Sequence, residues 1–184
     1  MLEQIGVRWW FAGGHALELF ASASWREHGD IDAGILCADV PRVSRALAHI
    51  EMHSAHDGKL YPLRPGDSAL AEANSVWCCE RAGGPWRFEL LLDWSEGSDW
   101  VCRRDPSVRM PLDEIARRSA DGVLYLRPEI QLLYKAKNLR PKDEADFAVV
   151  APLLDRAASH WLRAALARMH PGHPWLASEA LRST

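Results

Sequence analysis

The chain has 184 residues, of which 48% are hydrophobic and 26% are charged, and its net charge is −3 at pH 7. This length fits one domain, or one domain with a helical extension, with enough apolar side chains for a core. The net charge makes nucleic acid an unexpected partner, and no apolar run approaches the ~18 residues needed to cross a membrane. The first residues lack the basic and apolar regions of a signal peptide, so we expect a cytoplasmic protein.

The pattern of apolar and turn residues predicts strands and helices in the first part of the chain and helices in the last part. In the first half, the predicted elements are a helix end at 1–6, a strand at 7–11, a helix at 16–21, a strand at 30–36, a helix at 41–50 and strands at 59–63 and 75–80. In the second half they are a strand at 86–94, short turn-rich segments at 101–126 and helices that start at 128, 142 and 152. We therefore expect an α/β (α+β) core at 1–126 and a helical segment at 127–184 packed on it.

Two glycines between the first strand and the next helix predict a phosphate site. Gly13 and Gly14 would leave bare backbone N–H groups at a helix N-terminus. Asp30 and Asp32 lie on the following strand, where alternation places both carboxylates on one face, about 6.6 Å apart at Cα, with Ile31 pointing into the core. Carboxylates at this spacing can share a pair of divalent cations. Metal beside phosphate indicates nucleotidyl transfer.

A third carboxylate is expected on the strand at 86–94. Glu89 and Asp93 share one face of this strand, so alternation does not separate them. A carboxylate in the middle of a strand needs a partner, because burying it unpaired is costly. For Glu89 that partner is either a metal or an activated hydroxyl, or Arg87 in a structural ion pair.

Together, these motifs resemble the polymerase-beta-like nucleotidyltransferase superfamily. Residues 125–137 read YLRPEIQLLYKAK and residues 140–147 read RPKDEADF, and both segments look like the small aminoglycoside and lincosamide nucleotidyltransferase branch. The resemblance spans roughly residues 7–150. It implies a twisted mixed sheet flanked by helices, with Mg²⁺ and ATP bound in a cleft.

The resemblance also implies roles for single residues. The two aspartates match the metal-binding pair, and the two glycines match the turn that holds the triphosphate. The catalytic acid of the family usually sits within its strand, which favours Glu89 over Asp93 as catalytic group and third metal ligand. Lys135 is preferred over Lys137 as a nucleotide contact, since two residues two apart on a helix point in different directions. Lys142 either contacts the nucleotide or pairs on the surface.

The sequence thus predicts a Mg²⁺-dependent enzyme that moves AMP from ATP to a hydroxyl of a small antibiotic-like or sugar-like acceptor and releases pyrophosphate. One alternative is a toxin-type transferase that acts on tRNA or protein, although the net charge disfavours tRNA. Another is a catalytically silent module that binds a nucleotide or a partner, although both aspartates are present. The sequence specifies neither the acceptor nor the oligomeric state.

Other reactive side chains have ordinary structural explanations. The nine tryptophans are expected mainly in the core, with Trp94 or Trp100 as candidates to line a ligand cleft. No cysteine pair has the spacing of a zinc site, so we expect reduced and mostly buried thiols at Cys37, Cys78, Cys79 and Cys102.

Two histidines near the motifs and a cluster of three arginines also have ordinary explanations. His15 and His28 flank the motifs, and packing or capping is the expected role rather than metal binding. Arg103, Arg104 and Arg109 form a basic cluster, read as a solvated face in preference to a phosphate site.

Overall fold

A mixed sheet forms the centre of the protein, whose computed structural model describes residues 1–81 and 83–181. Within these residues, ten strands join one sheet with the main order β4-β3-β5-β6-β2-β1-β10-β9, while β7 pairs with β6 and β8 pairs with β7. The strands are β1 (Trp9–Phe11), β2 (Ile31–Leu36), β3 (Glu51–His56), β4 (Lys59–Leu63), β5 (Ser75–Cys79), β6 (Phe88–Glu96), β7 (Asp99–Val101), β8 (Arg109–Pro111), β9 (Ala116–Arg118) and β10 (Leu124–Leu126).

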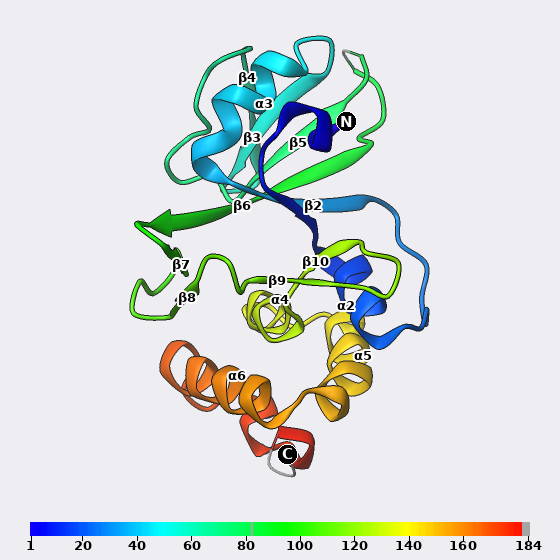
Figure 1. Ribbon diagram of the computed structural model, residues 1–184, viewed down its shortest axis with the longest axis vertical. Coiled ribbons are helices and arrows are strands. Elements are labelled where there is room, and N and C mark those ends of the chain that lie inside the picture. The colour runs from blue at the N-terminus through cyan, green and yellow to red at the C-terminus, as the bar shows by residue number, and fades with distance from the viewer. Residues whose placement is uncertain (82, 182–184) are drawn as a thin grey trace.

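Along the chain, α1, α2 and α3 alternate with the first strands, and α4, α5 and α6 follow the last strand (Figure 1). The α-helices are α1 (Leu2–Ile5), α2 (Gly13–Ala21), α3 (Val40–Ala46), α4 (Pro128–Lys135), α5 (Pro141–Val150) and α6 (Arg156–Met169). The 3₁₀-helices are η1 (Cys37–Asp39), η2 (Ala151–Leu153), η3 (Pro174–Ala177) and η4 (Glu179–Leu181). Among the described residues, no helix has the length and apolar character that a membrane span requires.

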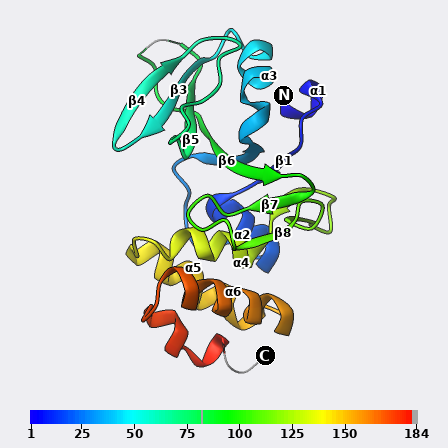
Figure 2. The same cartoon turned by 90° about the vertical axis from the view of Figure 1, so that its left-hand side faces the viewer.

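The two faces of the sheet are covered by different helices. On one face, Leu90 and Leu92 of β6 pack with Val40 and Val43 of α3 in one apolar cluster. On the other face, α2 and α4 contribute to a second and larger cluster, and α5 and α6 pack outside them (Figures 1 and 2). Because side chains alternate along β6, Glu89, Leu91 and Asp93 point to the opposite face from Leu90 and Leu92, the face covered by α2 and α4.

The structure confirms the predicted α+β class and corrects several details. A strand that the sequence pattern did not predict, β3, lies between β4 and β5, and the helix expected at 41–50 already ends at Ala46. The β3 sequence is mostly polar, and only Met52 and Ser54 are buried, so it lacks the apolar alternation that identifies strands. Ile31 does not point into the core: its side chain is 49% exposed, because it begins β2 at the end of the sheet.

The structure also shows the environments of the four cysteines and of Trp100. All four cysteines are free, and all but Cys37 are buried, as predicted. Burial raises the pKa of the Cys78 thiol to about 12, which keeps it protonated at neutral pH. Trp100 is fully buried in the core rather than in a cleft.

Candidate active site

Three carboxylates meet where β2 and β6 lie side by side. The two strands run parallel, and their register pairs Asp32 with Glu89, while Asp30 lies just before β2. One carboxylate oxygen from each of the three residues lies within 4.8 Å of those of the other two. None of the three forms an ion pair with a basic side chain in the part of the chain that the structure describes. The cluster is therefore a concentration of negative charge without a directly paired cation among the described residues, although the charges of Lys135 and Lys142 act on Asp32.

The pKa values of this cluster reflect burial and mutual repulsion. Desolvation, followed by the charges of Glu89 and Asp30, raises the pKa of Asp32 to about 6. Desolvation also raises the pKa of Glu89, although hydrogen bonds from Ser75 and Trp77 partly offset it. Trp77 donates from Nε1 to Glu89 Oε1 at 3.0 Å. A divalent cation would relieve this repulsion, and carboxylate oxygens are the ligands that Mg²⁺ prefers, so the donor set fits that metal.

The glycine turn lies against the same cluster. Gly13 begins α2 with a φ of +62°, and its N–H donates to Gln131 Oε1 at 2.8 Å. A Cβ on Gly13 would lie 1.8 Å from Asp32 Oδ2, and a Cβ on Gly14 would lie 2.1 Å from His28 Cε1. Gly13 thus requires glycine for its backbone conformation as well as for space, and a side chain at Gly14 would force His28 and Arg26 to move.

Ion pairs with two fully buried carboxylates, Asp143 and Asp146, hold a group of cations in place behind the turn. Lys135 on α4 contacts Asp146 Oδ2 at 2.9 Å and Asp143 Oδ1 at 3.2 Å, and its side chain is almost fully buried. Arg26 binds Asp146 and Arg140 binds Asp143. Burial alone would raise the pKa of Asp146, but hydrogen bonds from Arg26 and Lys135 outweigh it and lower the pKa. Three cations against two carboxylates leave a net positive charge beside the glycine turn.

A cavity of about 410 Å³ joins the carboxylates, the turn and these cations. Lys142 also lines it and forms no ion pair within the described residues. The sequence predicted Lys135 and Lys142 at this position but gave no role to Arg26, Arg140 or Gln131. Arg26 lies in a segment without regular structure, so no periodic pattern marks it.

Asp93 lies on the same face of β6 but outside this cavity. Its side chain is 2% exposed, and its Oδ1 accepts hydrogen bonds from Trp100 Nε1 at 2.8 Å and from the Tyr134 hydroxyl at 2.5 Å. Desolvation raises its pKa, against the effect of these hydrogen bonds. The structure therefore brings Glu89, and not Asp93, together with the two aspartates.

The structure also gives the contacts of Arg87 and of the two histidines near the motifs. Arg87 does not pair with Glu89; it contacts Glu80 at 3.2 Å on the exposed surface, since β6 begins only at Phe88. The rings of His15 and His28 lie 4.1 Å apart, and His28 Nε2 contacts Glu18 at 3.1 Å. Their rings thus pack against each other, and His28 also lines the cavity beside the carboxylates.

Comparison with known proteins supports the fold. No protein-family model matches the sequence, and no curated protein matches it. The solved lincosamide antibiotic adenylyltransferase LnuA, bound to lincomycin, is 14% identical over 81% of this chain and 89% of that chain, with a TM-score of 0.54. The antibiotic-resistance factor ANT(2'')-Ia in solution is 14% identical over 90% of this chain and 85% of that chain, with a TM-score of 0.57. Its complex with adenylyl-2''-tobramycin is 11% identical over 90% of this chain and 91% of that chain, with a TM-score of 0.55. The predicted resemblance is thus confirmed at the level of the fold.

Proposed function

We propose that this protein is a Mg²⁺-dependent nucleotidyltransferase that moves AMP from ATP to a hydroxyl of a small molecule. The observation that carries this proposal is the unpaired cluster of Asp30, Asp32 and Glu89 beside a glycine turn and a group of cations. The shared fold with adenylyltransferases supports it. A plain surface cluster of acids would not need Gly13 to leave room for one of its carboxylates.

The three carboxylates would hold the metal. Bound Mg²⁺ supplies positive charge that neutralises phosphate oxygens and favours in-line displacement. Asp32 is the central ligand in this proposal, since it adjoins Glu89 through the strand register and Gly13 through close contact. The N-terminus of α2 and the exposed Lys142 would bind the triphosphate, with Lys135 held by its ion pairs at the rear of the cavity.

Glu89 is proposed as the general base. Its raised pKa suits proton acceptance better than that of an ordinary exposed carboxylate, and the Trp77 hydrogen bond fixes its orientation. The acceptor oxygen forms a bond to the α-phosphorus while the bond from that phosphorus to the oxygen bridging to the β-phosphorus breaks. The hydroxyl proton passes to Glu89, and pyrophosphate leaves with the electron pair of the broken bond.

The test is a pyrophosphate-release assay with each of the four nucleoside triphosphates, Mg²⁺ and a panel of hydroxylated compounds that includes lincomycin and tobramycin. We expect release that requires both Mg²⁺ and an acceptor and that falls by orders of magnitude in Asp30→Asn and Asp32→Asn. Asp113→Asn is the matched control, since Asp113 is an exposed partner of Arg8. Unchanged release in both site variants would contradict the proposal.

A further inference from the structure

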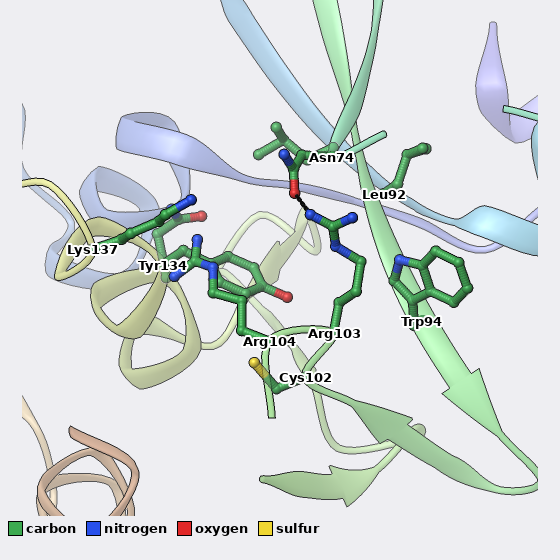
Figure 3. A pocket seen from close by; sticks show the side chains of 10 residues that line it. Asn74, Leu92, Trp94, Cys102, Arg103, Arg104, Tyr134 and Lys137 are labelled. Carbon is green, nitrogen blue, oxygen red and sulfur yellow. Dashed lines mark hydrogen bonds between the residues drawn. The ribbon is translucent and has the colours of Figure 1, made fainter. Parts of the chain in front are cut away.

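A second cavity beside the carboxylate site is lined by basic and aromatic side chains. Its volume is about 160 Å³. Arg103, Arg104 and Lys137 contribute the charges, and Trp94 and Tyr134 contribute the aromatic surface (Figure 3). No aspartate or glutamate is among its lining residues, so it differs sharply from the neighbouring site.

The two cavities are adjacent. Leu91, Gln131 and Tyr134 line both of them. Leu91 follows Glu89 by two residues on β6 and shares its face, and Gln131 binds the N–H of Gly13. A molecule in the second cavity would therefore extend toward Glu89 and the glycine turn, the place where an acceptor hydroxyl has to arrive.

The positive charges of the second cavity are not neutralised. Arg103 donates to the carbonyl oxygen of Glu72 at 2.7 Å and to the side-chain oxygen of Asn74, both uncharged acceptors (Figure 3). Arg104 lies 5.7 Å above the Tyr134 ring, and neither it nor Lys137 forms an ion pair with a carboxylate in the described parts of the chain. Arg103, Arg104 and Lys137 are all exposed, so a ligand from solvent can reach them. Desolvation lowers the pKa of Arg104, against the effects of Cys102 and Tyr134 and with a smaller contribution from the charge of Arg103.

One neutral donor points to the same ligand chemistry. The Trp94 Nε1 donor is buried without a hydrogen-bond partner among the described residues. Figure 3 shows the nitrogen edge of its ring toward Arg103. An oxyanion bound to Arg103 would also offer this N–H an acceptor, and a buried donor gains stability when it is paired.

We infer that the second cavity is the acceptor subsite and that it selects a small hydroxylated compound carrying a carboxylate or phosphate-type group. This inference rests on the proposed function, which places the reacting hydroxyl beside Glu89. The arginines bind the anionic group, since a guanidinium matches an oxyanion in two-point geometry. The ring of Trp94 packs on the apolar body. Polycationic acceptors are disfavoured, because three positive charges repel them.

Calorimetric titration tests the charge preference directly, without nucleotide. The probes are 3-(4-hydroxyphenyl)propanoate, (4-hydroxybenzyl)phosphonate, the primary amide of the first acid and the corresponding amine. We expect at least one anion to bind about tenfold or more tightly than the amide, since hydrogen bonds between ionised groups are stronger than those to a neutral amide. The amine should bind most weakly, and the two anions show which oxyanion is preferred.

Two variants locate the effect. Arg104→Gln should remove most of the difference between anion and amide, whereas Arg87→Gln should retain it, because Arg87 pairs with Glu80 on the surface. An amide bound as tightly as both acids, or a preferred amine, would overturn the inference. Displacement of the bound acid by ATP without Mg²⁺ would also overturn it, because the basic cavity would then belong to the nucleotide.

A further titration tests the proposed function independently of the charge preference. A non-hydrolysable ATP analogue with Mg²⁺ is titrated into wild-type protein and into Asp32→Asn. If the analogue fails to bind while the acid preference persists, the anion site stands and the transfer reaction is refuted. If the analogue binds in an Asp32-dependent manner but no acid is preferred, the anionic acceptor is refuted and the proposed function is untouched.

Discussion

Replacing Asp32 by Asn should stabilise the metal-free protein at neutral pH. The native pKa of this carboxyl is about 6, against an ordinary value of 3.8, chiefly because of desolvation and then the charges of Glu89 and Asp30. The folded state therefore holds the proton more tightly than the unfolded state does. Stability is lost as the pH rises from about 4 to about 6, and asparagine, which does not ionise, escapes this loss.

The magnitude follows from the size of the pKa change. A rise from 3.8 to about 6 corresponds to at most about 3 kcal/mol at pH 7, at 1.36 kcal/mol for each pH unit. Asp32 is only partly buried, so solvent screening reduces the expected gain to about 1–2 kcal/mol. Mg²⁺ should reverse the order, because it stabilises the ionised carboxylates of the wild type and finds one ligand fewer in the variant.

Urea unfolding from pH 4 to pH 8 in EDTA measures this effect, and a second series with Mg²⁺ measures the reversal. The curves of wild type and Asp32→Asn should converge near pH 4 and separate above pH 6. Asp113→Asn, at an exposed ion pair, should follow the wild type. A variant that is less stable than wild type at pH 7.5 in EDTA would refute the view that Asp32 lies in a repulsive carboxylate cluster.

Four further substitutions test other parts of the site. Glu89→Gln should lower the transfer rate about 10²–10⁴-fold in single-turnover assays while binding of Mg²⁺ and ATP weakens much less, since it removes the base but keeps a side-chain oxygen beside the metal; a near-normal rate would contradict its role as base. Gly13→Ala should weaken ATP binding in calorimetry, because its Cβ would lie 1.8 Å from Asp32 Oδ2, whereas Gly97→Ala, with a similar φ of +58° and open space outside this cavity, should bind normally. Asp93→Asn should lower the free energy of unfolding by about 1–3 kcal/mol through weaker buried hydrogen bonds, and loss of transfer in folded protein would restore it as a catalytic candidate. Lys142→Gln should raise the KM for ATP about tenfold with kcat retained, as the loss of one charge-assisted contact implies; an unchanged KM would place Lys142 outside the nucleotide site.

Sequence reasoning locates the acidic and glycine motifs because their geometry is local. Alternation along one strand puts Asp30 and Asp32 on one face, and a glycine pair before a helix predicts an open N-terminus. Both features need only a few consecutive residues. Their meeting with Glu89 depends on the parallel pairing of β2 and β6, which the strand register displays. The resemblance implied only that a third carboxylate lies on a later central strand.

The partners of Glu89 and Asp93 show where sequence reasoning stops. Alternation gives these two acids the same face but does not reveal what covers each of them. Trp77 reaches Glu89 from the neighbouring strand β5, and Tyr134 covers Asp93 from a helix 41 residues away. Such long-range contacts decide which acid faces a cavity and which is buried, and they leave no periodic trace in the sequence.

The central claim is nucleotidyl transfer, and the position of an isotopic label tests it most directly. ATP with ¹⁸O in the non-bridging oxygens of the α-phosphate or of the γ-phosphate is incubated with the protein, Mg²⁺ and 3-(4-hydroxyphenyl)propanoate or another acceptor from the panels. The products are then separated and identified by mass spectrometry. We predict that the α-label moves to the acceptor with the mass of one AMP group and that the γ-label leaves as pyrophosphate. A γ-label on the acceptor, or ATP consumed with no labelled acceptor in any panel, would contradict the claim.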